Sequence, residues 1–297
     1  ARAGTERDGK PFLDAFQRQG DAGLRRGFSL AFGGILAEKD VPRFLQLLRS
    51  EQDFRARNFA AVSLARIGSD EALGAVRQRL ADRSALPALR AFCALGAAVY
   101  GRDALSDDIV RAHGTARDPA EKTAMMLALA LFRRADLGGI EQAIASRAHP
   151  DLQGYASLAA VLGHGAEGTP IVRAALAGQD RAPALLRCGS LALGSQRGEE
   201  DLATYYALLD DPDKYVRGAA VQALGWSGRA DVVEELLARG RDARDSGSER
   251  IRESACVALG LLLAPEPSRR IYLRLCEMYE TTLGLELEAP LRLLETL

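Results

Sequence analysis

The stretch Asp211–Gly228, DPDKYVRGAAVQALGWSG, decides the fold of the chain. It opens with Asp-Pro, which suits a helix start because Asp caps free backbone amides and Pro at the first helical position loses no needed donor. Small and apolar residues then recur at helical spacing. A Leu-Gly pair follows, where glycine can adopt the left-handed conformation that ends a helix. The stretch therefore predicts one helix from Asp-Pro to Leu-Gly.

The pattern inside this stretch, R-x-x-A-x-x-A-L-G, recurs along the chain. Eight copies, some of them degenerate, end at residues 33, 65, 96, 132, 163, 194, 225 and 260. Four of the seven steps are 31 residues and a fifth is 32. The two longer steps contain the polar insertions GRDALSDD (101–108) and RGRDARDSGS (239–248). Such regular spacing indicates a repeated structural unit, and we call the helix that carries the pattern the marker helix.

A second amphipathic helix follows each marker helix. In ADVVEELLARG (230–240), Asp231 and Glu234 have the spacing of a capping box, and valines and leucines form one apolar stripe. A pair of antiparallel helices cannot bury such stripes alone, so neighbouring pairs must stack. The sequence therefore predicts an all-α fold, a right-handed α-solenoid (alpha-alpha superhelix) of about eight helix pairs with terminal caps.

The predicted array forms one elongated domain with a cap at each end. Residues 1–20 supply an N-terminal tail and a short capping helix, residues 21–282 form the repeat array, and residues 283–297 form a C-terminal capping helix.

The best copies are DPDKYVRGAAVQALG (211–225), RIRESACVALG (250–260) and PALRAFCALG (87–96), and they resemble HEAT repeats. More specifically, they are similar to the short HEAT-like repeats, of about thirty residues, that occur in phycobilisome lyases and many bacterial proteins. The resemblance covers about residues 20–282. It implies a solenoid fold, and it leaves the function open because this scaffold serves enzymes, adaptors and nucleic-acid binders alike.

The charge and the apolar content of the chain limit the classes of partner that it is expected to bind. The net charge is −1, with an excess of +5 in residues 1–150 and −6 in residues 151–297, so there is no global basic field for nucleic acid or anionic lipid. No apolar run is long enough to span a bilayer. The chain begins with Ala1 instead of Met, which we interpret as trimming, so the sequence does not give a compartment.

The sequence offers no recognisable catalytic or metal-binding cluster. One enzyme branch of the HEAT-like class binds iron through His-Glu dipeptides, but His113, His149 and His164 are not followed by Glu, and we expect no metal and no cofactor. GWSG (225–228) follows a helix and is not the nucleophile elbow of a hydrolase. The four cysteines lack paired spacing and are expected to be buried free thiols. The sequence thus predicts that the chain is not an enzyme.

The predicted function is a protein-interaction scaffold that binds a protein or peptide on a concave face built by the second helices. Nucleic-acid binding through the basic N-terminal half and a tetrapyrrole-lyase-like role are the alternatives. Trp226 is interpreted either as a cover for the turn between repeats or as an exposed anchor, and recurring Arg217 and Arg252 as structural residues that pair with neighbouring units. The candidate partner-binding residues are Arg43, Gln46, Gln78, Arg79, Gln142, Arg173, Trp226, Glu235 and Arg239.

Overall fold

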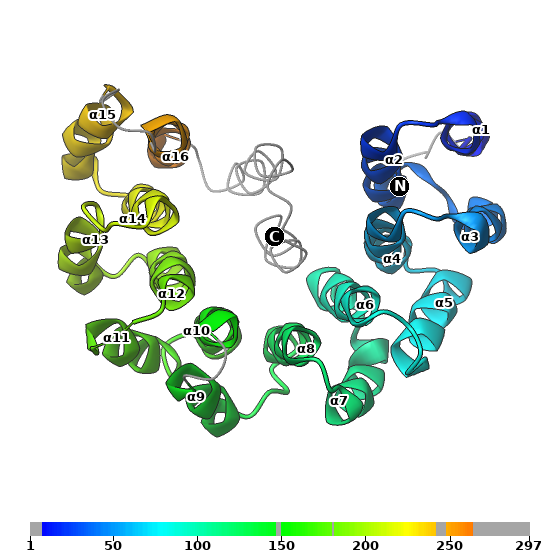
Figure 1. Ribbon diagram of the computed structural model, residues 1–297, viewed down its shortest axis with the longest axis horizontal. Coiled ribbons are helices and arrows are strands. Elements are labelled where there is room, and N and C mark those ends of the chain that lie inside the picture. The colour runs from blue at the N-terminus through cyan, green and yellow to red at the C-terminus, as the bar shows by residue number, and fades with distance from the viewer. Residues whose placement is uncertain (1–7, 147–149, 180, 242–247, 264–297) are drawn as a thin grey trace, which may run out of the picture. The chain divides into compact units, whose positions relative to one another are not determined.

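The computed structural model in Figure 1 describes residues 8–146, 150–179, 181–241 and 248–263. Within these ranges the regular structure is helical, with short 3-10 turns between some α-helices and no strand. The chain divides into two compact units, residues 1–132 and 133–297. The all-α prediction is therefore confirmed.

The described part of each unit is a series of α-helices joined by short connections. Those of unit 1 are α1 (Lys10–Arg18), α2 (Ala22–Ile35), α3 (Val41–Ser50), α4 (Phe54–Ile67), α5 (Asp70–Ala81), α6 (Pro87–Val99), α7 (Ser106–Thr115) and α8 (Pro119–Leu131). Those of unit 2 are α9 (Leu137–Ala145), α10 (Pro150–His164), α11 (Thr169–Ala177), α12 (Pro183–Gln196), α13 (Leu202–Leu208), α14 (Lys214–Trp226), α15 (Val233–Arg241) and α16 (Ser248–Leu263). The 3-10 turns are η1 (Glu38–Asp40), η2 (Asp103–Leu105), η3 (Glu199–Asp201) and η4 (Ala230–Val232).

The even-numbered helices are the marker helices, and the odd-numbered ones are the second helices. In unit 1, α2, α4, α6 and α8 pack along one another in chain order and form a continuous marker layer. In unit 2, α10, α12, α14 and α16 do the same. The second helices pack on the marker helices beside them and touch one another much less. This stacking of helical hairpins confirms the predicted α-solenoid architecture.

Within each unit the marker helices lie along the inner side of the arc, and the second helices lie along its outer side (Figure 1). The expectation that the second helices build the concave face is therefore wrong. The marker helices meet through alanine and glycine, whereas the second helices bury large side chains such as Phe44 and Tyr205. A two-layer stack curves toward its more tightly spaced layer, so the marker layer lies inside.

The glycine that ends the repeat pattern permits this close approach of neighbouring marker helices. A Cβ added to Gly194 would lie 2.9 Å from the Cα of Ala223, and one added to Gly225 would lie 2.5 Å from the Cα of Ala258. Both glycines lie inside their helices, so their predicted role as left-handed helix stops is wrong. The left-handed residues come three positions later, at Arg197 (φ 58°) and Gly228 (φ 73°).

The helix start predicted at Asp211-Pro212 is displaced by two residues. Asp213 is the cap of α14, and its carboxylate accepts hydrogen bonds from the backbone amides of Tyr215 (2.7 Å) and Val216 (3.2 Å). Asp211 instead accepts from the amide of Asp213 at 2.8 Å. A carboxylate two residues before the cap thus orders the capping residue itself.

The same prediction is correct at α8, where Asp118 caps the amide of Glu121 at 2.9 Å and Pro119 is the first helical residue. Its third copy starts α10 at Pro150, and the preceding His149 lies outside the described residues.

Helix α1 covers the N-terminal end of the array. Its Leu13 and Phe16 are buried. The Phe16 ring packs edge-on against Phe32 of α2 at 5.4 Å, and Phe32 packs edge-on against Phe44 of α3 at 5.0 Å. The C-terminal cap predicted over 283–297 lies outside the described residues. In the portion of the chain that is described, no helix has the length and apolar character required to cross a membrane.

Candidate binding pocket

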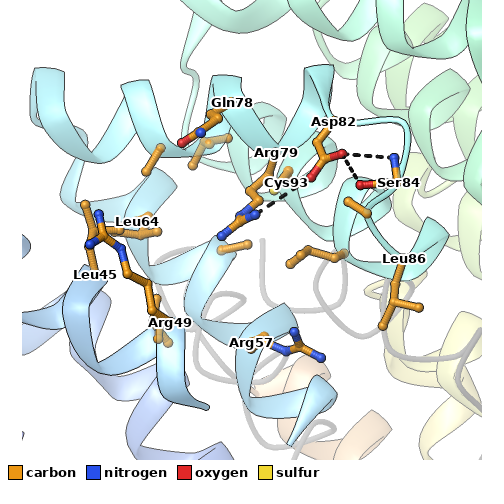
Figure 2. Close-up of a pocket in the computed structure, with 16 residues that line it drawn as sticks. Leu45, Arg49, Arg57, Leu64, Gln78, Arg79, Asp82, Ser84, Leu86 and Cys93 are labelled. Atoms are coloured by element: carbon orange, nitrogen blue, oxygen red, sulfur yellow. Dashed lines mark hydrogen bonds and ion pairs between the residues drawn. The ribbon is translucent and has the colours of Figure 1, made fainter. Parts of the chain in front are cut away.

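Unit 1 contains a pocket at the end of the hairpins where second helices stop and marker helices begin. It lies among α3, α4, α5 and α6 and has a volume of about 350 Å³ (Figure 2). This size is at the lower end of the range for sites that bind small molecules or one or two peptide side chains. Its apolar wall includes Leu45, Leu48, Leu64, Val76, Leu86 and Leu89, and its polar lining includes Arg49, Arg57, Gln78, Arg79, Asp82 and Ser84.

The apolar wall is partly open to solvent. Leu86 is 48% exposed although it is a large aliphatic residue, and it lies beside the pocket in the turn before α6 (Figure 2). Exposed aliphatic side chains around a concavity, together with a few convergent polar groups, are typical of a binding site. The pocket can therefore take an apolar group as well as a charged one.

One side of the pocket holds an anchored carboxylate. Ser84 donates to Asp82 from both its hydroxyl (2.6 Å) and its backbone amide (2.9 Å). The hydrogen bond from the Ser84 side chain is the main reason that the pKa of Asp82 lies below its ordinary value. Arg79 approaches the same carboxylate at 3.9 Å, a distance too long for a hydrogen bond.

The opposite side of the pocket in Figure 2 holds Arg49 and Arg57, with Arg79 between them and Asp82. Among the described residues, neither Arg49 nor Arg57 forms an ion pair, and the Nε of Arg57 is buried without a hydrogen-bond partner. Three arginines and a single aspartate therefore line the pocket. The pocket has a net positive charge and an unsatisfied buried donor, so its chemistry suits an anion.

The pocket brings together only two of the predicted binding residues, Gln78 and Arg79. Gln46 of α3 and Gln142 of α9 are exposed and line no described pocket. Trp226 at the end of α14 is half-buried and makes contacts of its own. Arg49 and Arg57 were not among the predicted site residues, although Arg57 occupies the arginine position of the repeat pattern.

The remaining predicted arginines form ion pairs between adjacent repeats. Arg43 of α3 pairs with Asp14 of α1. Arg173 of α11 donates to Asp201 at 2.6 Å and to Glu200 at 3.0 Å.

The same arrangement recurs farther along unit 2. Arg239 of α15 donates to Asp210 at 3.0 Å and to Glu235 of its own helix at 2.7 Å. These pairs hold second helices in register with the preceding or following repeat.

Histidines and cysteines do not assemble a reactive centre in the described part of the chain. No group of three potential metal-ligating side chains occurs there. Burial lowers the pKa of His113 and raises that of the Cys93 thiol to about 12, so Cys93 is an inert residue at the floor of the pocket.

The prediction that all four cysteines are buried is wrong for one of them. Cys93 and Cys188 are buried, but Cys256 is exposed because it lies on the solvent side of α16, and Cys276 lies outside the described residues.

The chain has the fold of a HEAT-like repeat protein. No protein-family model matches its sequence, and no curated protein matches it either. Among solved structures, it is similar to human deoxyhypusine hydroxylase in complex with glycerol, with a TM-score of 0.38 and 16% sequence identity. The similarity covers 85% of this chain and 96% of the hydroxylase.

This similarity corrects one expectation from the sequence, namely that the chain is not an enzyme. The hydroxylase is an enzyme by its name. At this identity and TM-score the similarity carries no argument about a reaction or a substrate.

Proposed function

We propose that the chain is a binding protein that holds a segment of another protein, and that the pocket among α3, α4, α5 and α6 is its anchor site. The supporting observation is the combination of an open aliphatic wall with Arg49 and Arg57, whose guanidinium groups have no acidic partner among the described residues. Interfaces concentrate their binding energy in such central pockets, which accept one or two anchoring side chains.

The binding proposal is best tested by selecting peptides from a random display library against the full chain. Peptides that bind should lose affinity for a Leu86→Ser variant, because that exchange removes the exposed part of the aliphatic wall. A Leu24→Ser variant is the matched control, since Leu24 is 55% exposed on α2 and lines no described pocket. Failure to select any peptide, or equal binding to both variants, contradicts the proposal.

Nucleic-acid binding through the N-terminal half is the second function that the sequence raises. Two of the basic side chains there already have acidic partners: Arg77 donates to Asp108 at 2.9 Å, and Arg43 pairs with Asp14. Affinity for duplex DNA that falls steeply with salt would favour this alternative over peptide binding. The tetrapyrrole-lyase-like role and the phycobilisome-lyase type of repeat stay predictions.

A further inference from the structure

Arg57 departs from the role that its repeat position has elsewhere. Eight residues before the end of the pattern, Arg25 donates to the carbonyl oxygens of Phe16 (3.1 Å) and Gln19 (2.9 Å) at the end of α1. Arg217, at the same position of a later copy, donates to the carbonyl oxygen of Asp211 at 2.8 Å. Both therefore satisfy backbone acceptors. The acceptor of Arg217 lies in the turn before its own helix, whereas the sequence interpretation expected one in a neighbouring unit. Arg57 makes no hydrogen bond of this kind in the described structure.

The carboxylates that could pair with Arg57 are already engaged by the preceding repeat. Glu51 accepts from Arg25 and from the backbone amide of Asp53, at 3.1 and 2.9 Å. Asp53 accepts from Arg26 at 2.8 Å and caps α4. The positive charge of Arg57 is consequently not neutralised by its own repeat, and it faces the pocket together with Arg49.

This arrangement defines the chemistry of the group that fits. A guanidinium binds a carboxylate through two parallel hydrogen bonds, and such charge-assisted bonds are stronger where water is excluded. Leu86, which is 48% exposed, offers an apolar surface in the same pocket. A cationic ligand is disfavoured because the lining carries three arginines and one aspartate.

The placement of charge also separates a peptide from a nucleic acid. Nucleic-acid sites carry arginine and lysine along an extended stripe that follows the phosphates. Arg49 and Arg57 instead line one pocket of about 350 Å³ together with an aliphatic wall. A carboxylate next to an aliphatic side chain matches this pocket better than a phosphodiester chain does.

We propose that the pocket recognises an acidic peptide segment, in which one carboxylate binds Arg57 and a neighbouring aliphatic side chain packs against Leu86. This inference rests on the proposed peptide-binding function and assigns its specificity to Arg57. Arg57 matches the repeat pattern in the sequence, and in the structure it lines the pocket.

Three fluorescein-labelled peptides test the inference on the full chain by fluorescence anisotropy: an alternating Leu-Glu hexapeptide, its Leu-Gln equivalent and its Leu-Lys equivalent. The Leu-Glu peptide should bind more tightly than the other two. Arg57→Gln should weaken its binding about tenfold to a hundredfold, because a charge-assisted pair is lost. Arg83→Gln should leave binding unchanged, since Arg83 is exposed in the neighbouring turn and does not line the pocket.

Thermal unfolding separates this role from a structural one. Arg57→Gln should keep the unfolding midpoint, whereas Arg217→Gln should lower it because backbone acceptors lose their donor. A fall in midpoint for Arg57→Gln as large as that for Arg217→Gln would overturn the inference, and so would unchanged Leu-Glu binding. Equal binding of the Leu-Glu and Leu-Gln peptides would overturn the charge selectivity while leaving the peptide-binding function in place. Binding of none of the three would contradict the acidic specificity, and the display experiment then decides the wider function.

Discussion

At the scale of single residues, burial separates inert side chains from accessible ones within one repeat pattern. Cys93 and Cys188 are buried in marker helices α6 and α12, whereas Cys256 is exposed on α16. The Cys93 thiol has a pKa of about 12, so almost none of it is the reactive thiolate at neutral pH. Three cysteines of marker helices therefore differ in their access to solvent.

Thiol labelling should reveal this difference. In the native protein at pH 7.5, iodoacetamide should modify Cys256 and leave Cys93 and Cys188 unmodified, as mapped by peptide mass spectrometry. The buried pair should react once the chain is unfolded in urea. Native labelling of Cys93 at a rate similar to that of Cys256 would contradict the assigned burial.

Arg90 and Glu121 form an ion pair inside the protein, where both side chains are almost completely buried, with 5% and 3% exposed. Arg90 Nη1 lies 2.6 Å from Glu121 Oε1, and Arg90 Nε donates to the carbonyl oxygen of Leu80 at 3.1 Å. Burial raises the pKa of Glu121, and the charge of Arg90 opposes that rise. A glutamate whose pKa is higher in the folded chain stabilises the fold most at low pH.

The pH dependence follows with a definite sign. The contribution of Glu121 should be complete below the pKa of the unfolded chain, about 4.3, and should be lost as pH rises through the higher folded value. The free energy of unfolding of the natural chain minus that of Glu121→Gln should therefore fall in urea titrations as pH rises above 4.5. Arg90→Met should cost roughly 3 kcal/mol near neutral pH because it leaves a buried charge unpaired. A difference that grows with pH would refute the assignment.

At the scale of helices, the spacing between neighbouring marker helices depends on glycine, which has no side chain. Gly225 of α14 lies so close to Ala258 of α16 that an added Cβ would sit 2.5 Å from its Cα. Gly74 of α5 also lies inside a helix, but nothing lies within 4 Å of the place where its Cβ would be. The two glycines thus have the same local conformation and opposite packing requirements.

The two positions make a matched pair of substitutions. Gly225→Ala should destabilise the chain by about 1–3 kcal/mol, because two helix backbones must separate. Gly74→Ala should stabilise it by roughly 0.5–1 kcal/mol, because alanine favours the helix and meets no neighbour. Urea unfolding followed by circular dichroism measures both. A stabilising Gly225→Ala would show that the marker helices are not in close contact.

These glycines also show what a repeat pattern can and cannot predict. The period of 31 residues predicts the marker helices, because a helical stripe and its spacing are local properties of the sequence. From the sequence alone, Gly225 fits either a helix stop or a close packing contact, because both favour a residue without a Cβ. Only the position of α16 separates the two, and that position is a tertiary property.

The binding pocket was less predictable than the fold for the same reason. Arg57 looks like Arg25 and Arg217 in the pattern, and its different role depends on partners that come from the preceding repeat. Arg173 and Arg239 looked like surface ligand contacts, but Asp201 and Asp210 neutralise them. Partner choice between repeats is not encoded in the periodicity of any one of them.

At the scale of the whole chain, each compact unit contains its own marker layer and its own buried residues. Repeat arrays are stabilised mainly by nearest-neighbour contacts, so a unit with several stacked hairpins can fold alone. Residues 8–132 should therefore give a helical fragment that unfolds cooperatively in urea, as measured by circular dichroism. A fragment without cooperative unfolding would show that unit 1 depends on residues beyond Phe132.

The tight marker layer has a mechanical consequence. When unit 1 bends, the closely packed inner helices should keep their spacing. The outer helices have few contacts with one another, so the distances between them should change. The pocket lies among α3, α4, α5 and α6, so an occupant contacts helices of both layers. We expect ligand binding and curvature to be coupled, and energy transfer between dyes on exposed positions of α1 and α7 should change when the Leu-Glu peptide binds. An unchanged transfer efficiency at saturation would show that the unit is stiff.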